Sequence, residues 1–95
     1  MKLGSYIKSP NENKQYVIDY SKWLEDGETL VSSVFSVSPT GMTVGTNVID
    51  GTGTLLSYFV SGGTNGVYYV LTVRVTTNIG QIKEDTVHYN VRAVA

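Results

Sequence analysis

The sequence predicts an all-β protein of immunoglobulin-like build, and three observations carry that prediction. Val, Thr, Tyr and Ser are prominent and ten residues are glycine, a mix that favours pleated strands and tight turns over helices. Residues 67–77 alternate between an apolar and a mixed face. Turn signals recur at regular spacing, which is typical of a β-sandwich of about seven strands. A small β-barrel is the alternative, because strand counting does not separate open from closed sheets.

The strand over residues 67–77 is expected to be central, because it is long and one of its faces is wholly apolar. The preceding Asn65-Gly66 pair is typical of a tight hairpin, which needs positive φ angles. The face toward the core should carry Val67, Tyr69, Leu71, Val73 and Val75. The face toward water or a partner should carry Tyr68, Val70, Thr72, Arg74 and Thr76.

Shorter strands are expected on both sides of the central one. In the first strand, Tyr16, Ile18 and Tyr20 share a face, and Ser21 is then expected to cap a single helical turn that carries Trp23. A bulge is expected near Ser32 in the second strand, because neither of its faces is cleanly polar. The expected ranges are 15–20, 28–37, 41–44, 47–49, 54–60 and 81–93.

The first 14 residues form a polar lead, with Tyr6 and Ile7 as its only sizeable apolar group. Two interpretations stay open: a frayed terminus, or an arm that docks on a neighbouring subunit through those two side chains. The domain division that follows is an N-terminal arm or flexible lead over residues 1–14 and a sandwich domain over residues 15–95.

Length and composition exclude several classes of protein. A chain of 95 residues suffices for one domain. With no cysteine, disulfides and thiolate metal sites are excluded. The net charge of −1 comes from scattered charges, so no footprint for nucleic acid is visible. No apolar run approaches the roughly 20 residues that span a bilayer, and the first residues lack the apolar stretch of a signal peptide.

The residues that carry catalysis in other proteins are scarce here. His88 is the only histidine, and alternation places it on the outer face of the last strand. A His/Cys metal cluster or a Cys–His pair therefore cannot be assembled, and nothing marks one serine as a nucleophile. We expect no catalytic residues, no cofactor and no metal, and so no enzyme.

Two loops suggest ligand sites but are better explained by structure. Glu25, Asp26 and Glu28 lack the alternating oxygen spacing of a calcium loop, which favours a solvated turn. The glycine-rich residues 62–66 lack the Lys-Ser/Thr ending of a phosphate loop and lead into a strand. Outward tyrosines such as Tyr58 and Tyr68 could stack on a sugar or a base.

The order of motifs resembles the small immunoglobulin-like virion proteins of tailed bacteriophages known as fibre–tail adaptors. Members typically have a Trp-Leu turn, Gly-Asp-Thr-Ile, Ser-x-Trp, a Ser-Gly-Gly-Thr-x-Gly-x-x-Tyr hairpin and a Thr-Thr-x-x-Gly turn. The corresponding segments here are DYSKWL at 19–24, DGETL at 26–30, FVSGGTNG at 59–66 with Tyr69, and VTT at 75–77 with Gly80. Phe35 stands where the family commonly has Trp, and Glu28 where it has Asp. The resemblance covers residues 15–92.

The resemblance implies a non-enzymatic structural protein of the phage particle that links or decorates tail and fibre components. Its partners would be other virion proteins of the tail, fibre or capsid, in multiple copies, with no nucleic acid and no membrane. Candidate partner contacts are Tyr6, Ile7, Tyr58 and Tyr68. A capsid cement protein on the head and a carbohydrate-binding module that touches the host surface are the alternatives.

Overall fold

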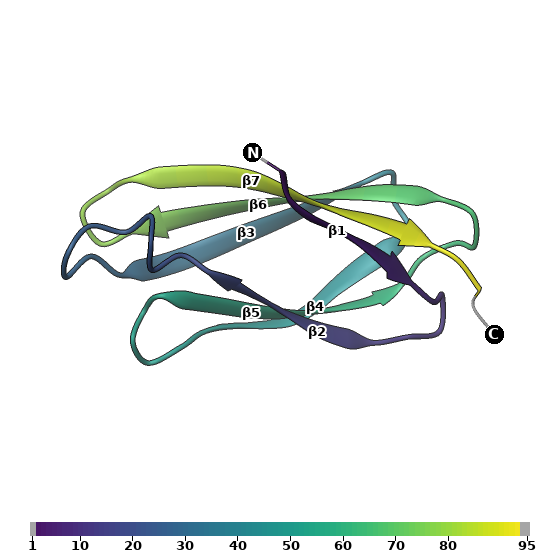
Figure 1. Cartoon of the computed structure of the whole chain (residues 1–95), viewed down its shortest axis with the longest axis horizontal. Coiled ribbons are helices and arrows are strands. Elements are labelled where there is room, and N and C mark those ends of the chain that lie inside the picture. The colour runs from purple at the N-terminus through teal and green to yellow at the C-terminus, as the bar shows by residue number, and fades with distance from the viewer. Residues whose placement is uncertain (1, 94–95) are drawn as a thin grey trace.

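The protein consists of two stacked β-sheets, seen edge-on in Figure 1. The computed structural model describes residues 2–93, and seven strands lie in that range. Their bounds are β1 Lys2–Lys8, β2 Lys14–Asp19, β3 Leu30–Ser38, β4 Met42–Ile49, β5 Leu55–Gly62, β6 Tyr68–Thr77 and β7 Ile82–Val91.

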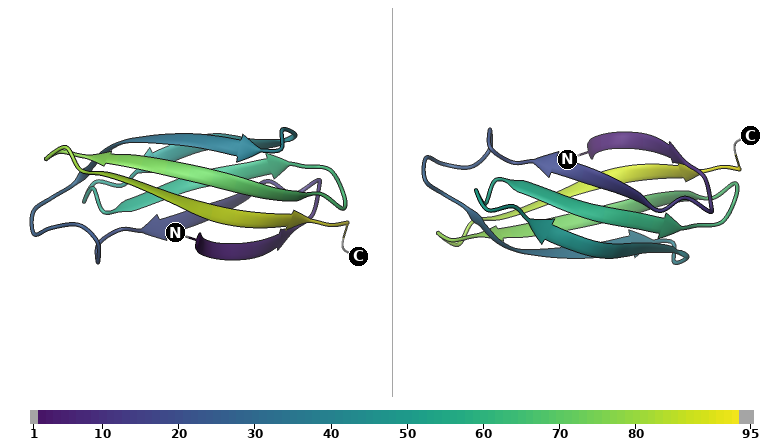
Figure 2. Two further views of the ribbon diagram at one scale, coloured as in Figure 1. Left: turned by 90° about the horizontal axis from the view of Figure 1, so that it is seen from above. Right: turned by 90° about the horizontal axis from the view of Figure 1, so that it is seen from below.

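The strands divide into a four-stranded sheet, in the order β1-β7-β6-β3, and a three-stranded sheet, in the order β2-β5-β4. Neighbouring strands are antiparallel except for β1, which runs parallel to β7. The views from above and below show the sheets stacked with their strands roughly along the long axis of the molecule (Figure 2). The predicted sandwich is therefore confirmed, and the two separate sheets rule out a closed barrel.

The alternation along β6 is confirmed by its burial. Tyr69, Leu71, Val73 and Val75 are buried, whereas Tyr68 and Arg74 on the other face are exposed. β6 lies between β7 and β3, as expected for a central strand. Its inner side chains contribute much of the core, and Trp23 and Phe35 pack against that core while partly buried.

Tyrosines form the middle of the core. The hydroxyls of Tyr58, on β5, and Tyr89, on β7, are 3.0 Å apart and form a hydrogen bond that joins the two sheets. Tyr16, on β2, packs edge-on against the Tyr89 ring at a centroid distance of 5.1 Å. Burial of the Tyr58 and Tyr89 hydroxyls leaves neither without a hydrogen-bond partner, because each bonds to the other.

These buried tyrosines predict that the protein loses stability in alkali. Burial raises the pKa of Tyr58 to about 12 and also raises the pKa of Tyr20 and Tyr89. In the unfolded chain a tyrosine ionises near pH 10. Above that pH the unfolded chain releases protons that the folded chain retains, so stability is complete below about pH 10 and falls as the pH rises further.

Chemical denaturation at a series of pH values, with tyrosine ionisation followed by absorbance, measures this loss. Tyr58→Phe combined with Tyr89→Phe should flatten the alkaline decline relative to the unsubstituted chain. A free energy of unfolding that stays constant up to about pH 12 would contradict the prediction.

Two local expectations need correction, and a third is confirmed. The ranges 41–44 and 47–49 are one strand, β4, whose pairing with β5 shifts register between Val44 and Asn47. The expected helical turn at 22–25 is a non-helical turn, in which the Trp23 and Leu24 amides both donate to the Tyr20 carbonyl. The bulge in β3 is present, between Leu30 and Ser32.

The N-terminal segment also differs from expectation. Residues 2–8 were expected to form an arm or flexible lead, but they form β1, an edge strand of the four-stranded sheet. The Tyr6 ring stacks on the buried Tyr89 at a centroid distance of 5.6 Å, so it packs on the core of its own chain. The chain then crosses to the other sheet through residues 9–13 to begin β2.

Candidate functional site

Tyr58 is not available to a partner. The sequence expectation placed it outward on residues 54–60, but its side chain is only 1% exposed and its hydroxyl is held by Tyr89. Both faces of that strand are rich in apolar residues, so the pattern alone did not reveal which face is inward. Tyr58 is therefore a core residue and is removed from the candidate contacts.

Ile7 and Tyr68 lie together on the outer face of the four-stranded sheet. Asn90 of β7 is the register partner of both, of Ile7 on β1 and of Tyr68 on β6, so the three form one cross-strand row. The Ile7 side chain is 63% exposed and Tyr68 is 48% exposed. The Tyr68 hydroxyl lies 2.7 Å from His88 Nδ1, which fixes the ring in place. We call Ile7 and Tyr68 the row-90 pair.

A second apolar group occupies the other end of the same sheet. Its four members, the hairpin-end group, are exposed and lie on β3, in the turn after β6 and at the start of β7: Val31, Val34, Ile79 and Ile82. In the same cross-strand row as Val34, Arg74 and Glu84 form an exposed ion pair with an N–O distance of 2.9 Å. The sequence interpretation did not single out the hairpin-end group. Outward positions of Val34 and Ile82, opposite the inward Phe35 and Val87, are the signal that could have found it.

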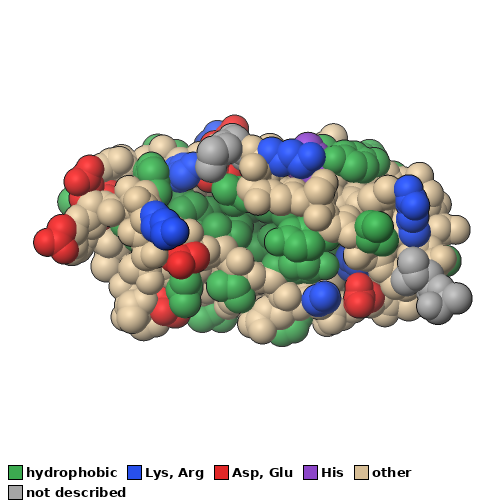
Figure 3. Space-filling view, in the orientation of Figure 1, with side chains coloured by type: hydrophobic (Ala, Val, Ile, Leu, Met, Phe, Trp, Pro, Cys, Tyr) green, Lys and Arg blue, Asp and Glu red, His purple; other side chains and the backbone are tan. Residues whose placement is uncertain are grey.

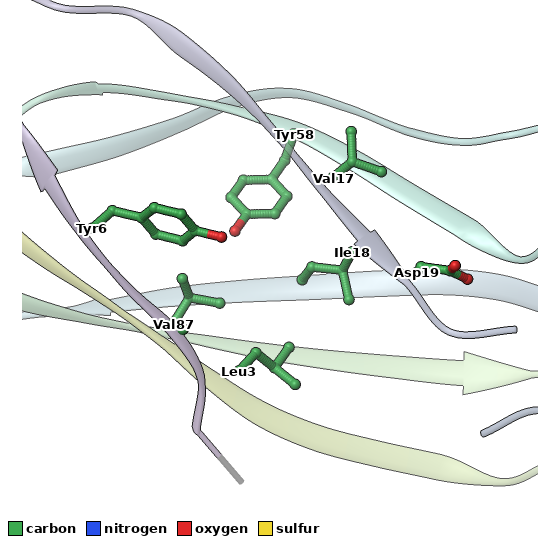
Figure 4. Close-up of a pocket in the computed structure, with 8 residues that line it drawn as sticks. Leu3, Tyr6, Val17, Ile18, Asp19, Tyr58 and Val87 are labelled. Atoms are coloured by element: carbon green, nitrogen blue, oxygen red, sulfur yellow. The ribbon is translucent and has the colours of Figure 1, made fainter. Parts of the chain in front are cut away.

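Tyr6 lies on a different surface, in a hollow between the edge strands β1 and β2. The hollow has a volume of about 220 Å³ and is lined largely by apolar side chains: Leu3, Tyr6, Val17, Ile18, Tyr58 and Val87, with Gly4 and Asp19. Figure 4 shows the Tyr6 and Tyr58 rings pointing toward one another across it. In the space-filling view, hydrophobic side chains gather at the middle of this side of the molecule, with charged groups around them (Figure 3).

Asp19 is the one acidic residue that lines this hollow. The Ser21 amide donates to Asp19 Oδ1 at 2.9 Å, and hydrogen bonds from the Ser21 side chain and amide hold the pKa of the Asp19 carboxyl below its usual range. The carboxyl is engaged with its own turn, which gives it a structural role.

Buried polar groups elsewhere act as connectors between elements. The Lys8 side chain is fully buried, and its Nζ donates to the carbonyls of Ser9 and Gly62 at 2.8 Å each. Burial lowers the pKa of this amine. Glu28, expected in a solvated turn, is also buried; it accepts the Thr77 hydroxyl and, at 2.8 Å, the Glu25 amide. These contacts tie loops to strands.

Within residues 2–93, no group of three or more His, Cys, Asp or Glu side chains is placed to hold a metal ion. Over the same range, no helix has the length and apolar character needed to cross a membrane. His88 contacts Tyr68 and Thr86 on the outer face of the sheet. The surfaces described above are therefore suited to contacts with other molecules, and the exposed apolar groups are the features that stand out.

Comparison with known proteins gives a fold neighbour and a family. The PKD domain of the KIAA 1837 protein, whose solution structure is known, superimposes with a TM-score of 0.53 over 96% of this chain and 84% of that chain, at 14% identity. That likeness supports the sandwich fold. A search of curated proteins finds no match.

A family model described as "Podophage GP4 fiber-tail adaptor protein gp77" matches residues 8–90. It covers all of β2 to β6 and nearly all of β7, and it agrees with the resemblance seen in the sequence. The description is that of a structural component of the phage tail. The chain belongs to this podophage fibre–tail adaptor family.

Proposed function

We propose that the protein is a non-enzymatic connector of the virion tail, which joins tail and fibre subunits through the outer face of its four-stranded sheet. One observation carries the proposal: this face has exposed apolar groups at both of its ends, the row-90 pair and the hairpin-end group. A domain with a single partner needs one such group, whereas a connector needs two.

The shape of the molecule supports two separate contacts. Its extents are 44 × 21 × 18 Å, with the strands roughly along the long axis. Thr76 on β6 is the register partner of Ile82, a member of the hairpin-end group. The distance along β6 from Tyr68 to Thr76 is about 27 Å at roughly 3.4 Å per residue. On this face the cross-strand partners Thr72 and Thr86 lie between the two groups, so a polar row separates them. Two partners can therefore lie on one face without excluding each other.

The alternatives from the sequence receive less support. A carbohydrate-binding module needs neighbouring exposed aromatic rings, but Tyr6 and Tyr68 lie on opposite sides of the four-stranded sheet. The family description names a tail adaptor, which favours the tail over the surface of the head. The absence of catalysis, the multiple copies and the exclusion of nucleic acid and membrane remain part of the proposal.

Paired serine substitutions test the two contacts separately. Ile7→Ser with Tyr68→Ser removes the row-90 pair, and Val34→Ser with Ile82→Ser reduces the hairpin-end group. All four side chains are exposed, so the variants should fold, as circular dichroism and thermal melting can verify. Val48→Ser, on the three-stranded sheet and 53% exposed, is the matched control.

The readout is the amount of this protein and of fibre protein in assembled particles. We expect particles made with one of the two variant pairs to lack the adaptor itself. Particles made with the other variant pair should contain the adaptor but lack the fibre. The control should assemble normally. Particles that contain normal amounts of adaptor and fibre with both variant pairs would overturn the proposed face.

A further inference from the structure

We propose that β1 is an exchangeable strand, which occupies the edge of β7 on a neighbouring copy of the protein in the same way as on its own. The partner for this surface is thus a second copy of the chain. The inference deepens the proposed function and rests on it for the setting, since a tail adaptor in several copies brings identical chains close together.

The edge of β7 accepts a strand mainly through backbone contacts. Residues 4–8 pair in parallel register with residues 87–91, and the pairing shifts between Lys2 and Gly4. At the far end, the Arg92 amide donates to the Lys8 carbonyl at 2.8 Å. A backbone ladder fits an identical strand equally well whether that strand belongs to the same chain or to another.

Few side chains hold β1 in its place. Lys8 is its only buried residue, and five of its seven residues are exposed. Tyr6 provides the main apolar contact, by packing on Tyr16 and Tyr89. Beneath Leu3 and Gly4 lies the 220 Å³ hollow, so this half of the strand covers a space that it does not fill. The segment is therefore among the first that should open.

The connection after β1 permits the exchange. β1 and β2 belong to different sheets and do not pair with each other, so the connecting residues 9–13 can extend without breaking a ladder. Within this connection, the Glu12 amide donates to the Ser9 carbonyl at 3.1 Å. Extending the loop breaks that bond, while the ring contacts of Tyr6 and the hydrogen bond from Lys8 to the Gly62 carbonyl re-form on the second copy.

The energy difference between the two arrangements is consequently small. The same strand lies in the same register in both, so most contact energies cancel. What remains is the strain of the loop and the entropy of association. A high local concentration, as between copies fixed in one particle, offsets the entropy of association. The family match begins at Lys8, so the rest of β1 lies outside the matched residues.

Engineered cysteines can detect the exchange, because the natural chain has none. Ser5 and His88 are register partners across β1 and β7, at a spacing suited to a disulfide. One preparation carries Ser5→Cys and a second, with a larger tag, carries His88→Cys. The two are unfolded, mixed, refolded together at high concentration and oxidised, so that every copy is free to choose its partner. Non-reducing electrophoresis separates the mixed disulfide by size.

The control mixes Ser5→Cys with Val48→Cys. Position 48 is exposed and lies on β4, in the other sheet, so an exchange of β1 does not bring it close to position 5. We expect the first mixture to give about tenfold more mixed disulfide than the control, because exchange raises the effective concentration of the two thiols. A single chain with both Ser5→Cys and His88→Cys should close internally. Once closed, it should no longer exchange.

Equal yields from the two mixtures, with the double variant closing normally, would overturn the proposal. A double variant that fails to close would also overturn it, since β1 would then not lie on β7. Because purified chain is used, these outcomes are independent of tail and fibre. The particle experiment that tests the proposed function can therefore succeed or fail independently of the strand-exchange experiment.

Discussion

Tyr89→Ala is expected to lower the free energy of unfolding by about 3–5 kcal/mol, the range for removing a large aromatic side chain from a core. The Tyr89 side chain is fully buried and packs on Tyr6 and Tyr16. The substitution also leaves the Tyr58 hydroxyl without its partner across the sheets. A domain of this size has a total stability of about 5–15 kcal/mol, so the variant should be close to unfolding. Urea denaturation measures the loss.

Tyr68→Ala provides the matched control for Tyr89→Ala. Tyr68 is the same residue type on the adjacent strand but on the outer face, and its loss should cost less than about 1 kcal/mol. If the two variants unfold at the same urea concentration, the assignment of inner and outer faces is reversed.

Gly63→Ala is the second substitution with a large expected effect. Gly63 has a φ of 102°, and a Cβ atom built there would lie 2.8 Å from Cγ2 of the buried Val91. The left-handed backbone costs a non-glycine residue about 1–3 kcal/mol, and crowding in a packed core adds about 1–3 kcal/mol. The sum is about 2–6 kcal/mol, again measured by denaturation.

Gly66→Ala separates these two contributions. Gly66 also has a positive φ, of 87°, but no atom beyond its chain neighbours lies within 4 Å of a Cβ placed there. It is the third residue of the turn in which the Val67 amide donates to the Thr64 carbonyl at 3.1 Å. Its substitution should therefore cost only the backbone contribution, about 1–3 kcal/mol. A Gly63 variant no less stable than the Gly66 variant would show that Val91 moves aside freely.

The faces of β6 and β7 could be predicted from the sequence because the inward residues of β6 up to Val75, and those of β7 from Val87 onward, are apolar. The outward positions carry polar groups such as Thr72, Arg74 and His88. The same reasoning failed for Tyr58. Its strand has Leu55 and Phe59 on one face and Leu56 and Val60 on the other, so hydrophobic alternation does not distinguish them. Only the stacking of the second sheet decides which face is buried.

β1 could not be predicted for a different reason. A strand on a parallel edge is fixed by pairing with residues far along the chain, here 86–91, and a local pattern does not record that pairing. Lys8 shows the same limit, because its burial depends on the carbonyl of Gly62, 54 residues away. The candidate contact surface was half visible: the sequence marked Tyr68 and Ile7 as candidates and both are exposed, but their shared row required the register of three strands.

The parallel pairing of β1 with β7 also has a mechanical consequence. Tension that pulls the start of β1 and the end of β7 in opposite directions runs along both strands, so it loads the bonds between residues 4–8 and 87–91 in shear. In shear these bonds bear the force together and must fail together. Thermal fraying, by contrast, opens them one after another from the Lys2 end. A strand that heat releases readily can thus resist a sudden pull along the axis of the molecule.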